Sequence, residues 1–267
     1  MGWRFAVSTL GMPGAPVRDA ARTALAHGCE GLELRVHPDE EVHLGLSRSA
    51  VDRVRSGLAD EGLAVACLAG YAKVTASGPD GPVIGELRAL IELAHRIGTS
   101  VVRVFPGGDG DAHPRIAAVL DDLRDAGVRL LVETHDSHPT GAAAVSLVAG
   151  FGAPDLAAVL WDAVHPWRAG EEPATTKEVL GPYLGYFQVK DATSRDDPTP
   201  VPPGRGAVPL GECGEQLRSW SGWVSLEWEK AWYPQIAPVE VPLRAAAAWV
   251  GRHAPRGNQS GDAGFTA

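Results

Sequence analysis

The sequence has few cysteines and no excess of positive charge. Its three cysteines, Cys29, Cys67 and Cys213, are odd in number and scattered, which excludes the paired spacing of a zinc-binding motif and the cysteine density of a disulfide-stabilised secreted domain. Lys and Arg number 24 against 33 Asp and Glu, and the net charge of −9 gives no electrostatic reason to expect nucleic acid or an anionic membrane as a partner.

Long apolar runs are also missing. No stretch approaches the length of a membrane span, and the apolar run after Met1-Gly2-Trp3-Arg4 is too short for a signal peptide. We therefore expect a soluble, cytoplasmic protein that binds neither nucleic acid nor membrane. The 267 residues, 45% of them hydrophobic, suffice for one large core, so a single compact domain is expected.

Eight short apolar segments alternate with stretches in which apolar residues have helical spacing. The expected strands are 5–10, 30–35, 63–69, 101–105, 128–133, 159–162, 184–190 and 223–227. The expected helices are 17–27, 47–62, 82–97, 114–126, 140–149, 175–180, 209–220 and 239–253, the second with Ser47 as its N-cap. This alternation predicts a closed parallel (β/α)₈ TIM barrel over residues 1–253 and a disordered tail over 254–267.

The alternative architecture is an open, doubly wound sheet. Dinucleotide-binding sheets of that kind carry Gly-x-Gly-x-x-Gly after the first strand. This chain has Gly11-Met12-Pro13-Gly14 at that point, which lacks the required spacing. The barrel is therefore favoured.

Four successive expected strands end with a side chain that can bind a metal. They are Glu133, Asp162, Gln188 and Glu227, and in a barrel the carboxyl ends of the strands meet at one mouth. Three carboxylates and an amide oxygen form a hard donor set, which suits one Mg²⁺ or Mn²⁺ ion, with Co²⁺ as a further candidate. The alternative for each residue is a lone polar group bonded to a backbone amide.

The strand ends LLVETH, VLWDAVH and VSLEWEK resemble those of the xylose-isomerase-like barrels, a superfamily of sugar isomerases and epimerases. The resemblance covers about residues 5–253 and implies Glu133, Asp162 and Glu227 as metal ligands. On the seventh strand that superfamily usually has His, whereas this chain has Gln188. The related 3-dehydroshikimate dehydratases look similar and also use Gln there.

The resemblance implies an enzyme with Glu133 and Glu227 as acid/base pair and His165 as a third catalytic group. A metal on the carbonyl and hydroxyl oxygens of a polyhydroxylated ketone would lower the pKa of the adjacent C–H and stabilise an enediolate. Return of the proton gives isomerisation or epimerisation, which the breadth of the resemblance favours. Loss of a β-hydroxyl gives dehydration, as in 3-dehydroshikimate or inosose dehydratases, and a 3-oxo-glycoside would undergo the analogous elimination.

Five further residues are candidates for substrate binding, each with a structural alternative: His135, Arg103, Lys190, Lys230 and Trp167. Arg103 and Lys190 lie inside apolar strands and must pair or reach a ligand; Lys190 could instead bridge to Asp191 or Glu229. Lys230 could remain a solvated surface lysine. Trp167, with Trp232, is placed in a mouth loop where it could form an apolar wall against a sugar ring.

Glu33 and Arg35 alternate with two leucines on the second strand and so share a face. That face is expected to be the barrel interior, where an internal ion pair competes with substrate binding as an explanation.

Two other functions remain open. An endonuclease for abasic DNA would need more His ligands and a basic face, and the acidic balance opposes it. A non-catalytic binding subunit on a degenerate barrel would tolerate loss of Glu133 and Glu227. The expected partner is a small polyol or keto-sugar, and the sequence allows a homo-oligomer.

Overall fold

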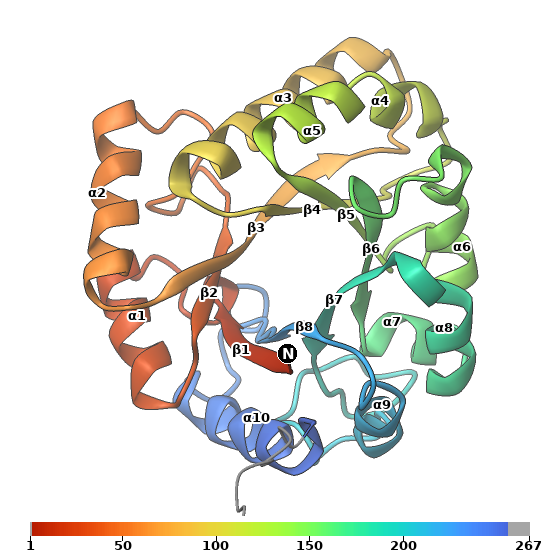
Figure 1. Ribbon diagram of the computed structural model, residues 1–267. Coiled ribbons are helices and arrows are strands. Elements are labelled where there is room, and N and C mark those ends of the chain that lie inside the picture. Colours follow the sequence, from red (N-terminus) through yellow and green to blue (C-terminus); the bar gives the residue numbers. More distant parts are fainter. Residues whose placement is uncertain (1, 256–267) are drawn as a thin grey trace, which may run out of the picture.

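The computed structural model describes residues 2–255 and has the expected fold. Eight parallel strands form a closed barrel in chain order, from β1 to β8, and helices surround it (Figure 1). The barrel closes between β8 and β1, with Trp3 opposite Gly222. The single-domain (β/α)₈ prediction is confirmed. The predicted disordered tail lies, from residue 256 onward, outside the described residues.

The strands lie close to their predicted positions. They are β1 (Trp3–Ser8), β2 (Gly31–Arg35), β3 (Ala64–Lys73), β4 (Val101–Phe105), β5 (Arg129–Glu133), β6 (Ala157–Asp162), β7 (Leu184–Val189) and β8 (Gly222–Leu226). Strand β3 is longer than predicted because Lys73 pairs with Phe105 of β4. Tyr71, expected in a loop, is therefore part of a strand.

The helices show two departures from the prediction. They are α1 (Val17–Ala26), α2 (Arg48–Asp60), α3 (Asp80–Ile97), α4 (His113–Ala117), α5 (Leu120–Ala126), α6 (Gly141–Ser146), α7 (Val164–Arg168), α8 (Pro173–Leu180), α9 (Leu210–Gln216) and α10 (Glu240–His253). The helix predicted over 114–126 is two helices, because the backbone leaves helical geometry at Val119, where φ is −118°. The predicted N-cap is confirmed, since Ser47 accepts a hydrogen bond from the Ala50 amide.

Helix α7 is the second departure, since a loop was expected directly after β6. Asp162 ends β6, and its carboxylate accepts a 2.7 Å hydrogen bond from the amide of Val164. This contact satisfies one of the free N–H groups at the start of α7. The same short helix carries His165 and Trp167, so their positions are fixed by helical geometry.

Inside the barrel the apolar side chains are mostly small. A separate buried group consists of Ala6, Ala66, Cys67, Leu131, Ala158, Leu160 and Tyr186. Their strand neighbours pack with the larger core under the helices, so by alternation this group points inward. Such small residues leave room for long polar side chains from the same strands. No helix of residues 2–255 is both long and apolar enough to cross a membrane.

Candidate metal centre

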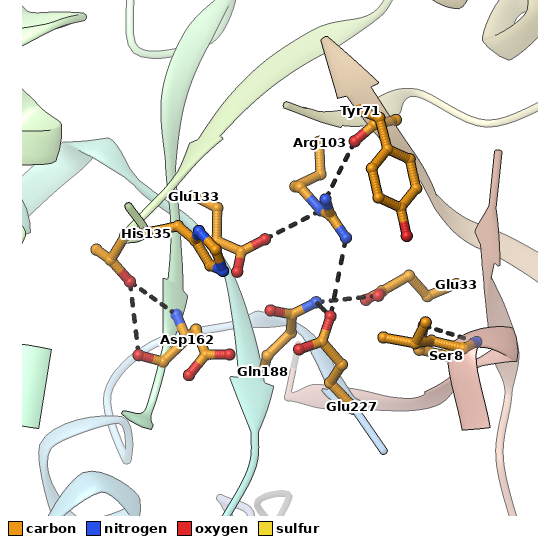
Figure 2. Close-up of polar contacts among 12 residues, drawn as sticks. Ser8, Glu33, Tyr71, Arg103, Glu133, His135, Asp162, Gln188 and Glu227 are labelled. Carbon is orange, nitrogen blue, oxygen red and sulfur yellow. Dashed lines mark hydrogen bonds and ion pairs between the residues drawn. The ribbon is translucent and has the colours of Figure 1, made fainter. Parts of the chain in front are cut away.

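The structure brings the three predicted carboxylate ligands together. Glu133 ends β5, Asp162 ends β6 and Glu227 directly follows β8, and all three are buried. Each offers an oxygen, and these oxygens lie within 4.8 Å of one another. Figure 2 shows the carboxylates converging from different strands. Glu133, Asp162 and Glu227 are called the carboxylate cluster below.

Gln188 of β7 points an amide oxygen to the same place. Its Nε2 donates hydrogen bonds to Glu33 Oε1 at 3.0 Å and to Glu227 Oε1 at 3.1 Å. Its Oε1 is buried and has no hydrogen-bond partner. In Figure 2 this oxygen lies on the side that faces Glu133 and Asp162. An orphaned buried acceptor of this kind calls for a ligand, and a metal ion would supply one.

Two buried cations neutralise part of the cluster. Arg103 Nε lies 3.0 Å from Glu133 Oε2, and Arg103 Nη2 lies 3.8 Å from Glu227 Oε1. Lys190 Nζ donates to Asp162 at 3.3 Å, to Glu227 at 2.8 Å and to Glu229 at 2.6 Å. The bridge from Lys190 to Glu229 was one of the alternatives considered from the sequence. Both Arg103 and Lys190 therefore lie at the predicted site.

By formal count, the three carboxylates of the cluster face two cations. Burial raises the pKa of Glu133 well above its ordinary value, against the attraction of Arg103. Burial also raises the pKa of Asp162 to about 7. Burial favours a raised pKa at Glu227 too, but Lys190 and Arg103 outweigh it and lower the pKa of that carboxyl. Crowded carboxylates and an orphaned amide oxygen fit a divalent cation with hard oxygen ligands.

Two histidines lie beside the cluster. The rings of His135 and His165 are 4.2 Å apart, and the His135 ring also packs on Phe105. Burial lowers the pKa of both imidazoles, which keeps them neutral at pH 7. His165 Nε2 is buried without a hydrogen-bond partner. With Glu133, the two rings form a second group whose donor atoms lie within 4.8 Å of one another.

His135 has an acidic neighbour. Its Nδ1 lies 2.8 Å from Asp136 Oδ1, but the two atoms make no hydrogen bond. Asp136 has a φ of +46°, the only positive φ at a non-glycine position among residues 2–255. Such a conformation is uncommon outside glycine and often marks a functional site.

A cavity of about 250 Å³ opens over the cluster. Its walls are Leu10, Tyr71, Lys73, Arg103, Phe105, Glu133, His135, Asp136, Glu227, Glu229 and Trp232. Tyr71, Phe105 and Trp232 form an aromatic part of the lining, and Trp232 is 52% exposed. Tyr71 and Phe105 were not predicted as site residues, because no pattern in the sequence indicates that β3 extends beside the end of β4.

Three predicted substrate-binding residues do not line this cavity. Lys190 is buried against the carboxylate cluster instead. Trp167 lies in α7 with a buried side chain, and the Arg195 guanidinium lies 5.0 Å from the centre of its ring. Lys230 donates hydrogen bonds from Nζ to the carbonyls of Pro234 and Ile236 in its own loop. Of the two predicted mouth tryptophans, only Trp232 lines the cavity.

Glu33 and Arg35 do not pair with each other. Arg35 forms an ion pair with Glu40 at 2.7 Å and donates to the Tyr71 hydroxyl at 2.8 Å. Glu33 is fully buried and accepts from Gln188. Its unusual position, a carboxylate within an apolar strand, was visible in the sequence, but its partner was not.

Comparisons with known proteins identify the family and support the fold. Residues 21–253 match the family model described as Xylose isomerase-like TIM barrel. The chain is similar to a 3-dehydroshikimate dehydratase of Bacillus anthracis, with 23% identity over an alignment of 238 positions that covers 79% of this chain and 84% of that protein.

Two solved structures have the same fold. One is a D-psicose 3-epimerase in the presence of D-fructose, with 16% identity, a TM-score of 0.73 and coverage of 93% of this chain and 98% of that one. The other is the IOLI protein with a zinc atom, with 16% identity, a TM-score of 0.75 and coverage of 94% and 99%. The named relatives thus include enzymes of more than one reaction class. Because the family model matches most of its length, the chain belongs to the xylose isomerase-like TIM barrel family.

Proposed function

We propose that this protein is a divalent-metal-dependent lyase that removes water from a small cyclic hydroxy ketone of the 3-dehydroshikimate type. The proposal rests on one observation. At the mouth of the barrel, the carboxylate cluster lies next to neutral imidazoles and the charged ammonium of Lys190. The similarity to a 3-dehydroshikimate dehydratase and the Gln at position 188 support the same reaction.

The site can hold the cation with residues of four neighbouring strand ends. Glu133, Asp162 and Glu227 would supply carboxylate oxygens, and Gln188 would supply its orphaned amide oxygen. When bound there, a divalent cation polarises a substrate carbonyl and makes the adjacent C–H more acidic. The ion would be Mn²⁺ or Mg²⁺, with Co²⁺ or Zn²⁺ as further candidates.

The chain's own residues provide an acceptor and a donor of protons. Neutral His135 lines the cavity and can accept the proton from the carbon beside the carbonyl. The C–H electron pair becomes the new double bond while the β-hydroxyl departs. Lys190 is a protonated ammonium beside the cluster and can give the departing hydroxyl the proton that makes it water.

This assignment moves proton transfer away from the two glutamates named in the sequence analysis. Glu133 and Glu227 would both be ligands of the cation, and a carboxylate bound to a cation is a poor proton acceptor, so these two side chains are better suited to hold the cation than to exchange protons. Elimination needs one acceptor and one donor, and the mouth offers groups of these two kinds.

Epimerisation is the second candidate, because it is supported by one specific observation. Glu133 and Glu227 are acidic groups on opposite sides of the cluster, from β5 and from the end of β8. Two such carboxylates could remove and return a proton on opposite faces of one carbon. The structural similarity to a D-psicose 3-epimerase makes the reaction worth testing.

One experiment separates the two reactions. Protein stripped with chelator and reloaded with Mn²⁺ would be incubated in D₂O with 3-dehydroshikimate, inososes, 3-oxo-glycosides and ketohexoses. We expect loss of one water from a cyclic hydroxy ketone, visible by mass and by the ultraviolet absorbance of the unsaturated product. Deuterium incorporated at the carbon beside the carbonyl, with no loss of water, would instead support epimerisation. No turnover and no exchange with any substrate would contradict both and favour a binding protein.

A further inference from the structure

A fourth buried carboxylate lies inside the barrel, beside the carboxylate cluster but outside the group of candidate ligands. Glu33 of β2 is 0% exposed. Among residues 2–255 it has no Lys, Arg or His within ion-pair distance, and its Oε2 has no hydrogen-bond partner. It accepts a 3.0 Å hydrogen bond from Gln188 Nε2, and the nearby Ser8 hydroxyl lowers its pKa against the effect of burial. Burial of a carboxylate with so few partners costs folding free energy, which suggests that Glu33 serves a function.

The contact decides which end of the Gln188 amide faces the cluster. The amide nitrogen has two hydrogens, one donated to Glu33 and one to Glu227. If the amide were turned over, its oxygen would lie about as close to two carboxylate oxygens, and three acceptors would repel one another. Glu33 therefore disfavours the turned amide and directs the Gln188 oxygen toward Glu133 and Asp162, as Figure 2 shows.

Glu227 cannot perform this role alone. It is itself a candidate ligand, and Lys190 and Arg103 already lie against its oxygens. A cation bound at the cluster would compete for the same oxygen that Gln188 contacts. Glu33, by contrast, is outside the ligand group and keeps its acceptor for Gln188 whether or not a cation is bound.

We propose that Glu33 is a positioning residue for the metal site: it holds the side-chain nitrogen of Gln188 so that the amide oxygen serves as the fourth ligand. The inference rests on the metal-dependent function proposed above. An amide has two ends of similar shape, so an amide ligand needs a hydrogen-bond acceptor behind its nitrogen to present the correct end. Supporting residues of this kind orient metal ligands in general and affect metal affinity about 10–100-fold.

The test measures Mn²⁺ affinity by calorimetric titration of chelator-treated protein, with no turnover involved. Glu33→Met has similar length but no acceptor, and we expect it to weaken Mn²⁺ binding by about 10–100-fold. Glu33→Gln removes the charge but keeps a side-chain oxygen that can accept from Gln188, and we expect an affinity within about threefold of the original. Phe187→Leu is the matched control, because Phe187 is equally buried on β7 and has no polar side-chain atom that could contact Gln188 or Glu33; its affinity should not change.

The outcomes separate the inference from the function on which it rests. Thermal melting without metal first verifies that each variant folds. An unchanged affinity in Glu33→Met overturns the positioning role, and an equal loss in Glu33→Gln overturns it in favour of a purely electrostatic effect. Failure of the unmodified protein to bind any divalent cation would overturn the metal-dependent function itself.

Discussion

Two buried carboxylate sites lie close together in this chain and are built differently. Asp191 lies two residues after the end of β7, and its oxygens accept hydrogen bonds from the amides of Ala192, Gly204, Gly206 and Val208 at 2.8–3.1 Å. These contacts close the long loop after β7 onto one side chain. At the carboxylate cluster, in contrast, like charges lie side by side, and Glu133 Oε2 and Gln188 Oε1 make no hydrogen bond.

The difference shows what each site is built to do. Fixed backbone N–H groups satisfy Asp191 permanently, so its burial stabilises the fold. The cluster has crowded carboxylates and a free acceptor that a bound cation would satisfy, which is a pattern of functional rather than structural sites. Substitutions at the cluster should therefore change metal binding and activity, and substitution of Asp191 should change stability.

Glu133→Gln should have the largest effect on activity. It removes one cluster carboxylate while keeping the side-chain shape, and we expect kcat/KM to fall on the order of 10³-fold or more. The melting temperature of the metal-free protein should not fall, because less repulsion among carboxylates offsets the lost contact with Arg103. Glu30→Gln, on the exposed surface, is the control. A large drop in melting temperature without loss of activity would reverse the assignment of the two sites.

Lys190→Met should have the next largest effect on activity. It leaves Asp162, Glu227 and Glu229 without their shared cation, so the metal-free protein should lose about 3–5 kcal/mol of stability. Loss of the proposed proton donor should lower kcat about 10²-fold. Because Mn²⁺ can neutralise the same carboxylates, its addition should raise the melting temperature more in this variant than in the original protein. Unchanged kcat would exclude Lys190 as the donor.

Asp191→Ala should affect the fold instead of the chemistry. Four amides lose a charged acceptor, and we expect the free energy of unfolding to fall by about 3 kcal/mol, measured by urea denaturation. The Mn²⁺ dissociation constant should stay within about threefold. Asp196→Ala, an exposed position in the same loop, should leave stability unchanged. If Mn²⁺ binding is lost while stability is kept, Asp191 belongs with the metal site.

A smaller effect is expected from pH. Burial raises the pKa of Asp162 to about 7 and raises that of Glu133 as well, so below pH 7 protons occupy carboxylates that the cation needs. Mn²⁺ affinity should therefore rise with pH and be about tenfold weaker at pH 6 than at pH 8. Titrations at both pH values in one buffer system check this. Equal affinities would mean that the cation binds elsewhere.

The fold and the positions of the candidate ligands could be predicted from the sequence. They follow from the local periodicity of apolar residues and from the rule that all strands of a parallel barrel end at the same mouth. Each strand could be recognised alone, and parallel strands in a barrel carry their last residues to one mouth. Glu133, Asp162, Gln188 and Glu227 therefore could be grouped without knowing any distance. Their convergence required only that the eight units close in order.

Other features depend on contacts that are distant in the sequence or on loop geometry. Glu33 and Gln188 are 155 positions apart, so no pattern could pair them. The prediction that Trp167 lies in a mouth loop was wrong. The Asp162 carboxylate accepts a hydrogen bond from the Val164 amide at the start of α7, and this short helix buries the indole. Lys230 was misplaced because its ammonium is used by carbonyls of its own loop, whose path the sequence does not reveal.

The proposed function requires that one divalent cation is bound jointly by residues at the ends of β5 to β8. The most direct measurement is a crystal structure of the Mn²⁺-loaded protein with anomalous data. We expect a single strong anomalous peak surrounded by oxygens of Glu133, Asp162, Gln188 and Glu227. A peak centred instead on Glu133, His135 and His165, or no peak at the barrel mouth with Mn²⁺ in excess, would contradict it.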